Sequence, residues 1–147
     1  MKQVTLITLL LVLCSAIGAC DARAQSAINV NIGKIRNNKG VCCVLLFTDP
    51  SAFPGDAKRA IASKVIKAEK GVRNIRFEKI PPGTYAIAVI HDENEDGLLN
   101  TNFLGIPKEG YGASNNNLPM TSAPKFSGSS FTISGKDKTL EIGLKYY

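Results

Sequence analysis

A turn followed at once by an alternating segment constrains the fold of this chain most. Pro81-Pro82-Gly83 predicts a turn, and residues 84–90 after it alternate with a period of two, which is typical of a β-strand. One face of this strand carries Tyr85, Ile87 and Val89, and the other carries Ala86, Ala88 and Ile90. The small residues predict that a sheet approaches this second face closely. A tyrosine just past a turn can also return its hydroxyl group to the nearby backbone.

Six further segments have the composition of short strands, and residues that favour turns separate them. They cover residues 28–32, 41–47, 63–68, 72–79, 130–134 and 139–147. We expect the first two to form an opening hairpin and the last two a closing hairpin. One short helix is expected over residues 57–62, capped by Asp56. The sequence therefore predicts an all-β protein, an antiparallel β-sandwich of Ig-like or prealbumin-like type with about seven strands.

The amino-terminal residues resemble a secretory signal peptide. A basic Lys2 precedes an apolar run, and Ala22-Arg23-Ala24 provides a small-x-small cleavage site. We expect residues 1–24 to be removed and residues 25–147 to form one exported domain, periplasmic or secreted, without a transmembrane segment. In the alternative, residues 17–20 resemble a lipoprotein box, and Cys20 would carry a lipid anchor.

The charge of the chain gives little evidence of a specific partner. The formal net charge is +6, but the basic residues are scattered and do not alternate with aromatic residues. This pattern argues against nucleic acid as a partner. It is explained by solubility and by weak attraction to anionic surfaces.

An acidic loop follows the alternating strand, with four acidic residues at positions 92–96. Its spacing resembles the first half of a calcium loop, in which alternate residues direct hard oxygen ligands to one ion. The expected ligands of Ca²⁺ are Asp92, Asn94, Asp96, the carbonyl group of Leu98, Asn100 and Glu109. In the alternative, Asp, Asn and Gly are present because a tight loop between strands prefers them. An ion here would brace the loop and would not catalyse a reaction.

An enzyme is the other function class that we consider. His91, Asp92 and Glu109 provide the side chains of a hydrolase-like site, provided that the fold brings them together. The chain has no Gly-x-Ser-x-Gly motif of a nucleophile elbow. The sequence supports no specific reaction, and we expect a protein that is not an enzyme.

Residues 98–128 have no clear period and are rich in Gly, Asn, Ser and Pro. Long loops of this kind in compact domains are often functional, and they often carry recognition residues. The candidate ligand-binding residues are His91, Asn102, Tyr111, Ser114, Asn115 and Asn116. The alternative is an ordered loop that packs its own aromatic side chains onto the sheet.

Several motifs together resemble one protein family over nearly the whole mature chain. They are Phe53-Pro54, the Pro-Pro-Gly-x-Tyr-Ala segment from Pro81, the His-Asp-x-Asn-x-Asp-Gly segment from His91, and residues 101–116. The chain is similar to the DUF2141 family of small exported bacterial proteins. The Pro-Gly-x-Tyr segment is also similar to prealbumin-like and carboxypeptidase-regulatory-like domains. The family often has Gly in place of Glu95 and Asp in place of Asn100, so this loop has one fewer anionic ligand.

The resemblance implies export and a sandwich fold, and it implies no activity. We therefore expect a non-catalytic binding or structural module of the cell envelope. Its partner would be an envelope protein, a glycan or a small ligand.

Overall fold

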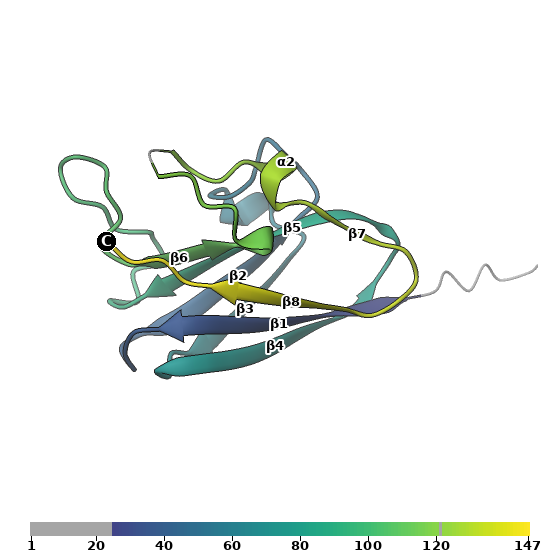
Figure 1. Cartoon of the computed structure of the whole chain (residues 1–147), viewed down its shortest axis with the longest axis horizontal. Coiled ribbons are helices and arrows are strands. Elements are labelled where there is room, and N and C mark those ends of the chain that lie inside the picture. Colours follow the sequence, from purple (N-terminus) through teal and green to yellow (C-terminus); the bar gives the residue numbers. More distant parts are fainter. Residues whose placement is uncertain (1–24, 121) are drawn as a thin grey trace, which may run out of the picture.

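The computed structural model describes residues 25–120 and 122–147. The predicted signal peptide and the alternative lipidation site at Cys20 lie outside the described residues. The described part is a β-sandwich with eight strands, so the all-β prediction is confirmed (Figure 1). The strands are β1 (Ser26–Ile35), β2 (Val41–Phe47), β3 (Ala62–Lys67), β4 (Gly71–Ile80), β5 (Gly83–Asp92), β6 (Gly110–Ala113), β7 (Phe131–Ile133) and β8 (Lys138–Gly143).

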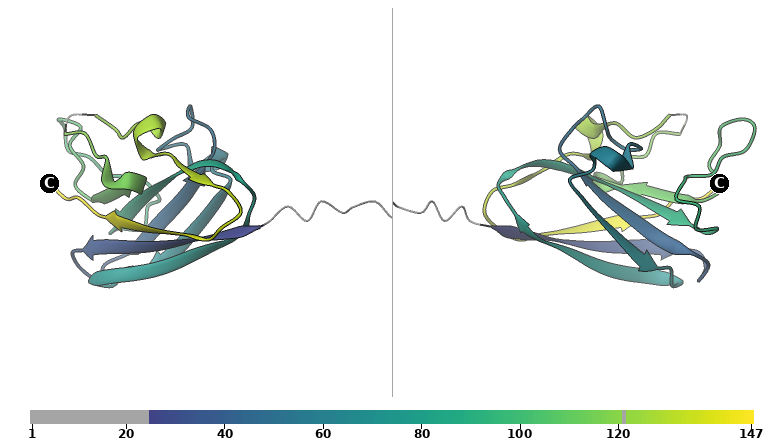
Figure 2. Two further views of the ribbon diagram at one scale, coloured as in Figure 1. Left: turned by 45° about the vertical axis from the view of Figure 1, so that its right-hand side comes forward. Right: turned by 180° about the vertical axis from the view of Figure 1, so that it is seen from behind.

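Two sheets form the sandwich. The first has the order β4-β1-β8, and the second has the order β3-β2-β5-β6, with β7 pairing with the start of β5. All strand pairs are antiparallel except β1 and β8, which run parallel from Ile28 beside Lys138 to Gly33 beside Gly143. Figure 2 shows the two sheets from two further directions.

Both predicted hairpins are wrong, because in each case the two strands belong to different sheets. β1 pairs with β4 and β8, whereas β2 pairs with β3 and β5. β7 pairs with β5, whereas β8 lies beside β1. Each of these strands has one strongly apolar face that must be buried. The connections at residues 36–40 and 134–137 therefore carry the chain across the sandwich, so that the apolar faces meet from opposite sides.

The described residues contain three short helical segments. The helix predicted over residues 57–62 is reduced to a 3-10 turn, η2 (Ala57–Arg59), and the side chain of Asp56 makes no capping hydrogen bond. The other two are η3 (Ser114–Asn116) and α2 (Phe126–Ser129). Within the described ranges, no helix has the length and apolar character needed to cross a membrane.

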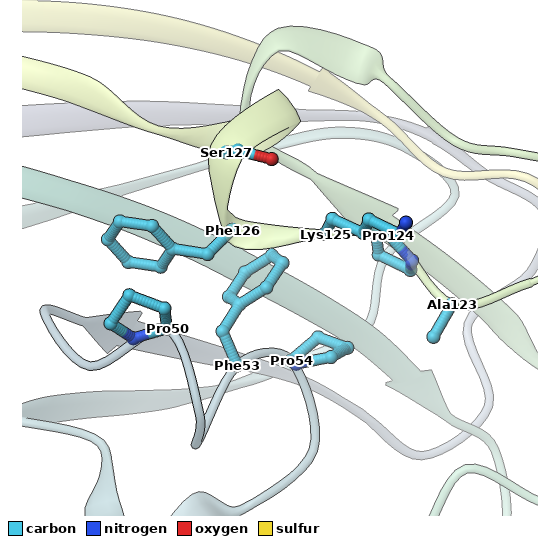
Figure 3. Close-up of a pocket in the computed structure, with 8 residues that line it drawn as sticks. All are labelled: Pro50, Phe53, Pro54, Ala123, Pro124, Lys125, Phe126 and Ser127. Carbon is cyan, nitrogen blue, oxygen red and sulfur yellow. The ribbon is translucent and has the colours of Figure 1, made fainter.

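The alanine face of β5 is covered by loops and not by a second sheet. Phe53, from the loop after β2, lies edge-on between Phe47 and Phe126, with ring centroids 5.6 and 6.0 Å apart. Ala86 and Ala88 pack in the same cluster, where larger side chains would displace these rings. The predicted close approach of a sheet is therefore wrong, because connecting segments cover this face. Figure 3 shows Phe53 on the loop after β2 and Phe126 at the start of α2.

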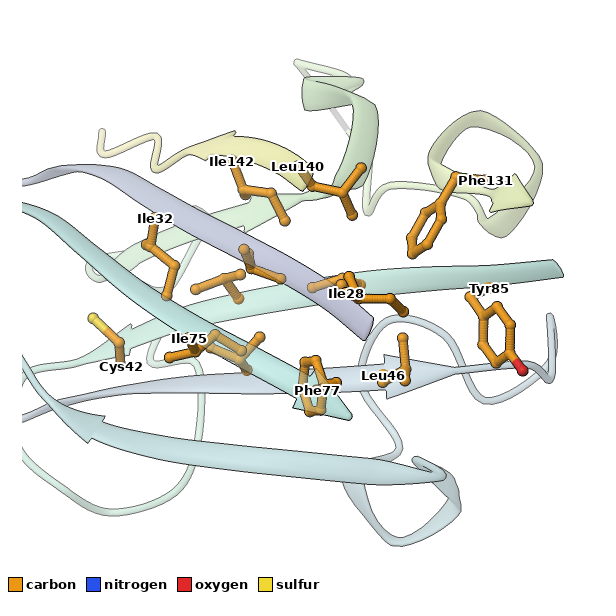
Figure 4. Close-up of a cluster of buried hydrophobic side chains, with 14 of the residues drawn as sticks. Ile28, Ile32, Cys42, Leu46, Ile75, Phe77, Tyr85, Phe131, Leu140 and Ile142 are labelled. Atoms are coloured by element: carbon orange, nitrogen blue, oxygen red, sulfur yellow. The ribbon is translucent and has the colours of Figure 1, made fainter. Parts of the chain in front are cut away.

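The main core lies between the two sheets (Figure 4). Tyr85, Ile87 and Val89 of β5 face it, as the alternation predicts. Ile28, Val30 and Ile32 of β1 reach it from the opposite sheet and are fully buried. The hydroxyl group of Tyr85 donates a hydrogen bond of 2.8 Å to the carbonyl oxygen of Pro81, so the predicted return of this hydroxyl to the backbone is confirmed.

Candidate functional site

The segment between β5 and β6 carries most of the candidate residues. It begins with the acidic loop, residues 92–97, and continues into a protruding loop, residues 98–108, which we call the finger. Figure 1 shows the finger as an extended green loop beside the carboxyl terminus. The site is therefore at one end of the sandwich, where β5 and β8 finish.

Asp92 shapes the acidic loop from inside. Its side chain is buried, and its carboxylate accepts backbone N–H bonds from Glu95 at 2.7 Å, Asp96 at 3.3 Å and Gly97 at 2.8 Å. Glu95 and Gly97 have φ values of 61° and 78°, which reverse the chain around this carboxylate. The loop thus wraps around a negative charge that belongs to the end of β5.

Asp96 gathers the next two predicted calcium ligands. One of its carboxylate oxygens accepts a hydrogen bond of 2.9 Å from the side-chain amide of Asn94 and another of 2.9 Å from that of Asn100. The hydrogen bond from Asn100 is the main reason why the pKa of Asp96 lies below its usual value. Leu98 contributes its N–H group to the other oxygen, at 2.9 Å.

Glu109 joins the two ends of the segment. Its buried carboxylate accepts one N–H bond from Glu93 and one from Asn100, each of 2.9 Å. Both carboxylate oxygens of Glu109 are therefore occupied by backbone N–H groups. In the part of the chain that the structure describes, no three His, Cys, Asp or Glu side chains are grouped closely enough to hold a metal ion. The calcium site stays a prediction, with Asn94, Asp96 and Asn100 as the ligands that lie together.

His91 is completely buried, and both of its ring nitrogens have partners. Nε2 lies 2.8 Å from the carbonyl oxygen of Lys39, and Nδ1 lies 2.8 Å from the hydroxyl oxygen of Tyr146. A carbonyl oxygen can only accept a hydrogen bond, so Nε2 carries the hydrogen. Nδ1 of the neutral ring then accepts a hydrogen bond from the hydroxyl group of Tyr146. Within the described residues, no hydrogen bond joins the side chain of His91 to that of Asp92 or Glu109.

Arg36 and Tyr146 complete this end of the sandwich, and sequence analysis missed both. The guanidinium group of Arg36 donates to Glu93 at 2.6 Å and to the carbonyl oxygen of Lys108 at 3.0 Å. It also lies over the ring of Tyr146, 4.6 Å from the centroid. The hydrogen bond from Arg36 holds the pKa of Glu93 below its ordinary value. Arg36 and Tyr146 are 110 positions apart, so no local pattern links them.

Ser114, Asn115 and Asn116 bind backbone groups of neighbouring segments. The hydroxyl group of Ser114 is buried and accepts the N–H of Ile87 at 2.9 Å. Asn115 donates to the carbonyl oxygen of Ser130 at 2.9 Å. Asn116 bonds to the exposed edge of β8, with one bond of 2.7 Å to Glu141 and one of 2.8 Å from Gly143. Of these three, only Asn116 therefore links to the other sheet. The role of the three as ligand-binding residues stays a prediction.

Tyr111 is buried against the carboxyl terminus. Its backbone exchanges two hydrogen bonds with Lys145, and its hydroxyl group lies 3.4 Å from that of Tyr147. Burial raises the pKa of the Tyr111 hydroxyl to about 12. Tyr111 therefore closes the end of the sandwich, where β6 meets the residues after β8.

The model of a family described as an uncharacterized protein conserved in bacteria, DUF2141, matches residues 30–141. The chain belongs to the DUF2141 family. The match includes the acidic loop and the finger. No curated protein and no solved structure matched the chain.

The finger of this DUF2141 protein has a braced backbone and an apolar tip. The side-chain oxygen of Asn102 accepts the N–H groups of Leu104 and Ile106, at 2.9 and 3.0 Å. Asn102 was predicted to bind a ligand, and its position at the tip was not foreseen. Four apolar side chains of the finger are exposed to solvent: Phe103 is 94% exposed, Leu104 68%, Leu98 64% and Ile106 39%. Several exposed apolar side chains on one braced, protruding loop are typical of an interaction surface.

Proposed function

We propose that this protein is a non-catalytic binding module of the cell envelope and that the finger is its recognition element. The observation that carries the proposal is the 94% exposure of Phe103 on a loop whose backbone is held in place. An aromatic side chain in water gains free energy when a partner covers it. A fixed backbone lowers the entropy that is lost on binding.

The contacts beneath the finger support a binding role over the hydrolase alternative. The polar atoms of His91, Asp92 and Glu109 are engaged in hydrogen bonds that shape the loops. A general base or nucleophile needs an atom that is free to meet a substrate. Location in the envelope follows from the predicted signal peptide.

Photo-cross-linking in the bacterium that makes the protein tests this function. A photoreactive phenylalanine derivative replaces Phe103, and in a matched strain it replaces Val72. Val72 is 63% exposed and belongs to β4 in the other sheet. We expect a discrete adduct from position 103 and none from position 72, because only the finger meets a partner.

Two results would contradict the proposal. One is the absence of any adduct from position 103 while the protein is present at its normal level. The other is the same set of adducts from both positions, which would indicate random collisions of exposed side chains.

We also propose that the acidic loop binds Ca²⁺ weakly through Asn94, Asp96 and Asn100. The observation that favours this is the meeting of the three side chains at one oxygen of Asp96. Side-chain amides present either an oxygen or a nitrogen by rotation, so two amide oxygens can join this carboxylate around a cation. Such an ion would brace the base of the finger.

Thermal unfolding tests the calcium proposal. After chelation, about 10 mM Ca²⁺ should raise the melting temperature by roughly 5 °C, because an ion that binds only the folded form stabilises it. The rise should disappear in Asp96→Ala and persist in Glu95→Gln, since Glu95 is exposed and next to the proposed site. Equal melting temperatures with and without Ca²⁺ would exclude the ion from this loop.

A further inference from the structure

A second apolar feature lies on the surface, away from the finger. Between α2 and the loop after β2 there is an open groove of about 440 Å³. Its lining residues are Pro50, Phe53, Pro54, Ala123, Pro124, Lys125, Phe126 and Ser127. Figure 3 shows the two phenylalanine rings between the prolines. A groove of this size and composition can take one or two apolar side chains from a partner.

Acidic residues are in excess at the base of the finger, whereas the charged residue that lines the groove is basic. Lys125 is the charged residue that lines the groove, and among the described side chains it forms no ion pair. The exposed carboxylates of Glu95 and Asp96 stand at the base of the finger, joined to it through Asn100. These two carboxylates outnumber the exposed Lys108 there, so the base of the finger is better suited to a basic surface than to an anionic membrane.

The finger and the groove lie on the same side of the molecule. Figures 1 and 2 show the finger, α2 and the loop after β2 projecting to the side away from the β4-β1-β8 sheet. Two features on one side can be exchanged by a two-fold axis, so that the finger of each copy enters the groove of the other. In such an interface both copies contribute the same surface, so association stops at the dimer.

We propose that the partner of the finger is a second copy of this chain, which receives Phe103 in its groove. This inference rests on the proposed function, in which the finger is the recognition element. The contact pairs an apolar tip with an apolar groove and acidic residues with Lys125. Because a finger and a groove cover little surface, the dimer is weak and forms only at high protein concentration.

Sedimentation velocity over a range of concentrations tests the dimer. The protein is expressed from the full sequence, purified after any processing, and compared with Phe103→Ser and Ala123→Glu. Both residues are exposed, so both variants should keep the melting temperature of the natural chain. We expect the natural chain to approach twice its monomer mass. Each variant alone should associate at least tenfold more weakly, because the first lacks the tip and the second has a blocked groove.

Mixing the two variants gives the sharpest result. The groove of the Phe103→Ser variant is intact, and so is the finger of the Ala123→Glu variant, so the mixture should recover part of the dimer through one contact. A contact between two fingers would leave the Ala123→Glu variant dimeric on its own. High salt should weaken the natural dimer, because it screens Lys125 from the acidic residues.

Several outcomes would overturn the inference. A natural chain that stays monomeric at all concentrations, a dimer that both variants retain, or a mixture without recovery would each do so. An adduct from position 103 that joins the chain to a different molecule would also overturn it while supporting the proposed function. Absence of any specific adduct from that position would count against the proposed function itself.

Discussion

Replacing Gly110 with alanine is expected to lower the free energy of unfolding by about 3–5 kcal/mol. Gly110 pairs with His91 across β5 and β6, and the ring of Tyr146 lies directly above it. A Cβ atom at this position would overlap that ring. The ring must therefore move, and the buried Nδ1 of His91 loses the hydroxyl group that donates to it.

Chemical unfolding of Gly110→Ala beside Gly33→Ala measures this effect. Gly33 is the matched control, because it also lies in a strand and has nothing within 4 Å of an added Cβ atom. The control should change stability by less than about 0.5 kcal/mol. Equal stability of Gly110→Ala and the natural chain would show that Tyr146 does not need its position against β6.

Replacing Asp92 with alanine is expected to cost about 2–4 kcal/mol of unfolding free energy, measured in the presence of a chelator. Three backbone N–H groups of the acidic loop lose their common acceptor. The loop can no longer close around the end of β5. Asp96 belongs to this loop and accepts a hydrogen bond from Asn100, so the base of the finger should also become less ordered.

Asp92→Asn keeps the shape of the side chain but replaces one acceptor oxygen with a donor. It should therefore lose an intermediate amount of stability. Hydrogen exchange locates the change: the amides of Glu95 and Gly97 should lose protection in both variants, whereas those of β1 should lose none beyond the global effect. Unchanged protection at Glu95 and Gly97 would contradict the assigned role of Asp92.

The sequence predicted well those features that depend on neighbouring residues. The two faces of β5, the turn at Pro81-Pro82-Gly83 and the hydroxyl bond of Tyr85 all follow from residues within a few positions. Most strands were placed by alternation or by a continuous apolar run, which shows which side chains are buried. β6 (Gly110–Ala113) was not predicted, because it lies in the segment without a clear period. Alternation does not show which strand lies beside which. For this reason both predicted hairpins were wrong.

The end of the sandwich could be predicted only in part. Asp92, Asn94, Asp96 and Asn100 form a local motif in the sequence. In the structure, Asn94 and Asn100 bond to Asp96, and Asp92 bonds to the backbone of the same loop. The link from His91 through Tyr146 to Arg36 joins three distant parts of the chain. Glu109 was placed in the right region, but its backbone partners depend on how the finger returns to β6. Asn102 offered a usable clue, since Asn often binds the backbone two residues ahead.

The parallel pairing of β1 with β8 affects how this protein folds. Ile28 lies beside Lys138, about 110 positions later in the sequence, so β1 acquires its second neighbour only through a contact between distant parts of the chain. Until then β1 has an open edge, and one side of the main core lacks Leu140 and Ile142. Closing a loop of this length before any contact is gained carries an entropic cost, and folds rich in such contacts form slowly. During folding, the chain must therefore remain soluble with an unpaired edge on β1 until β8 pairs with it.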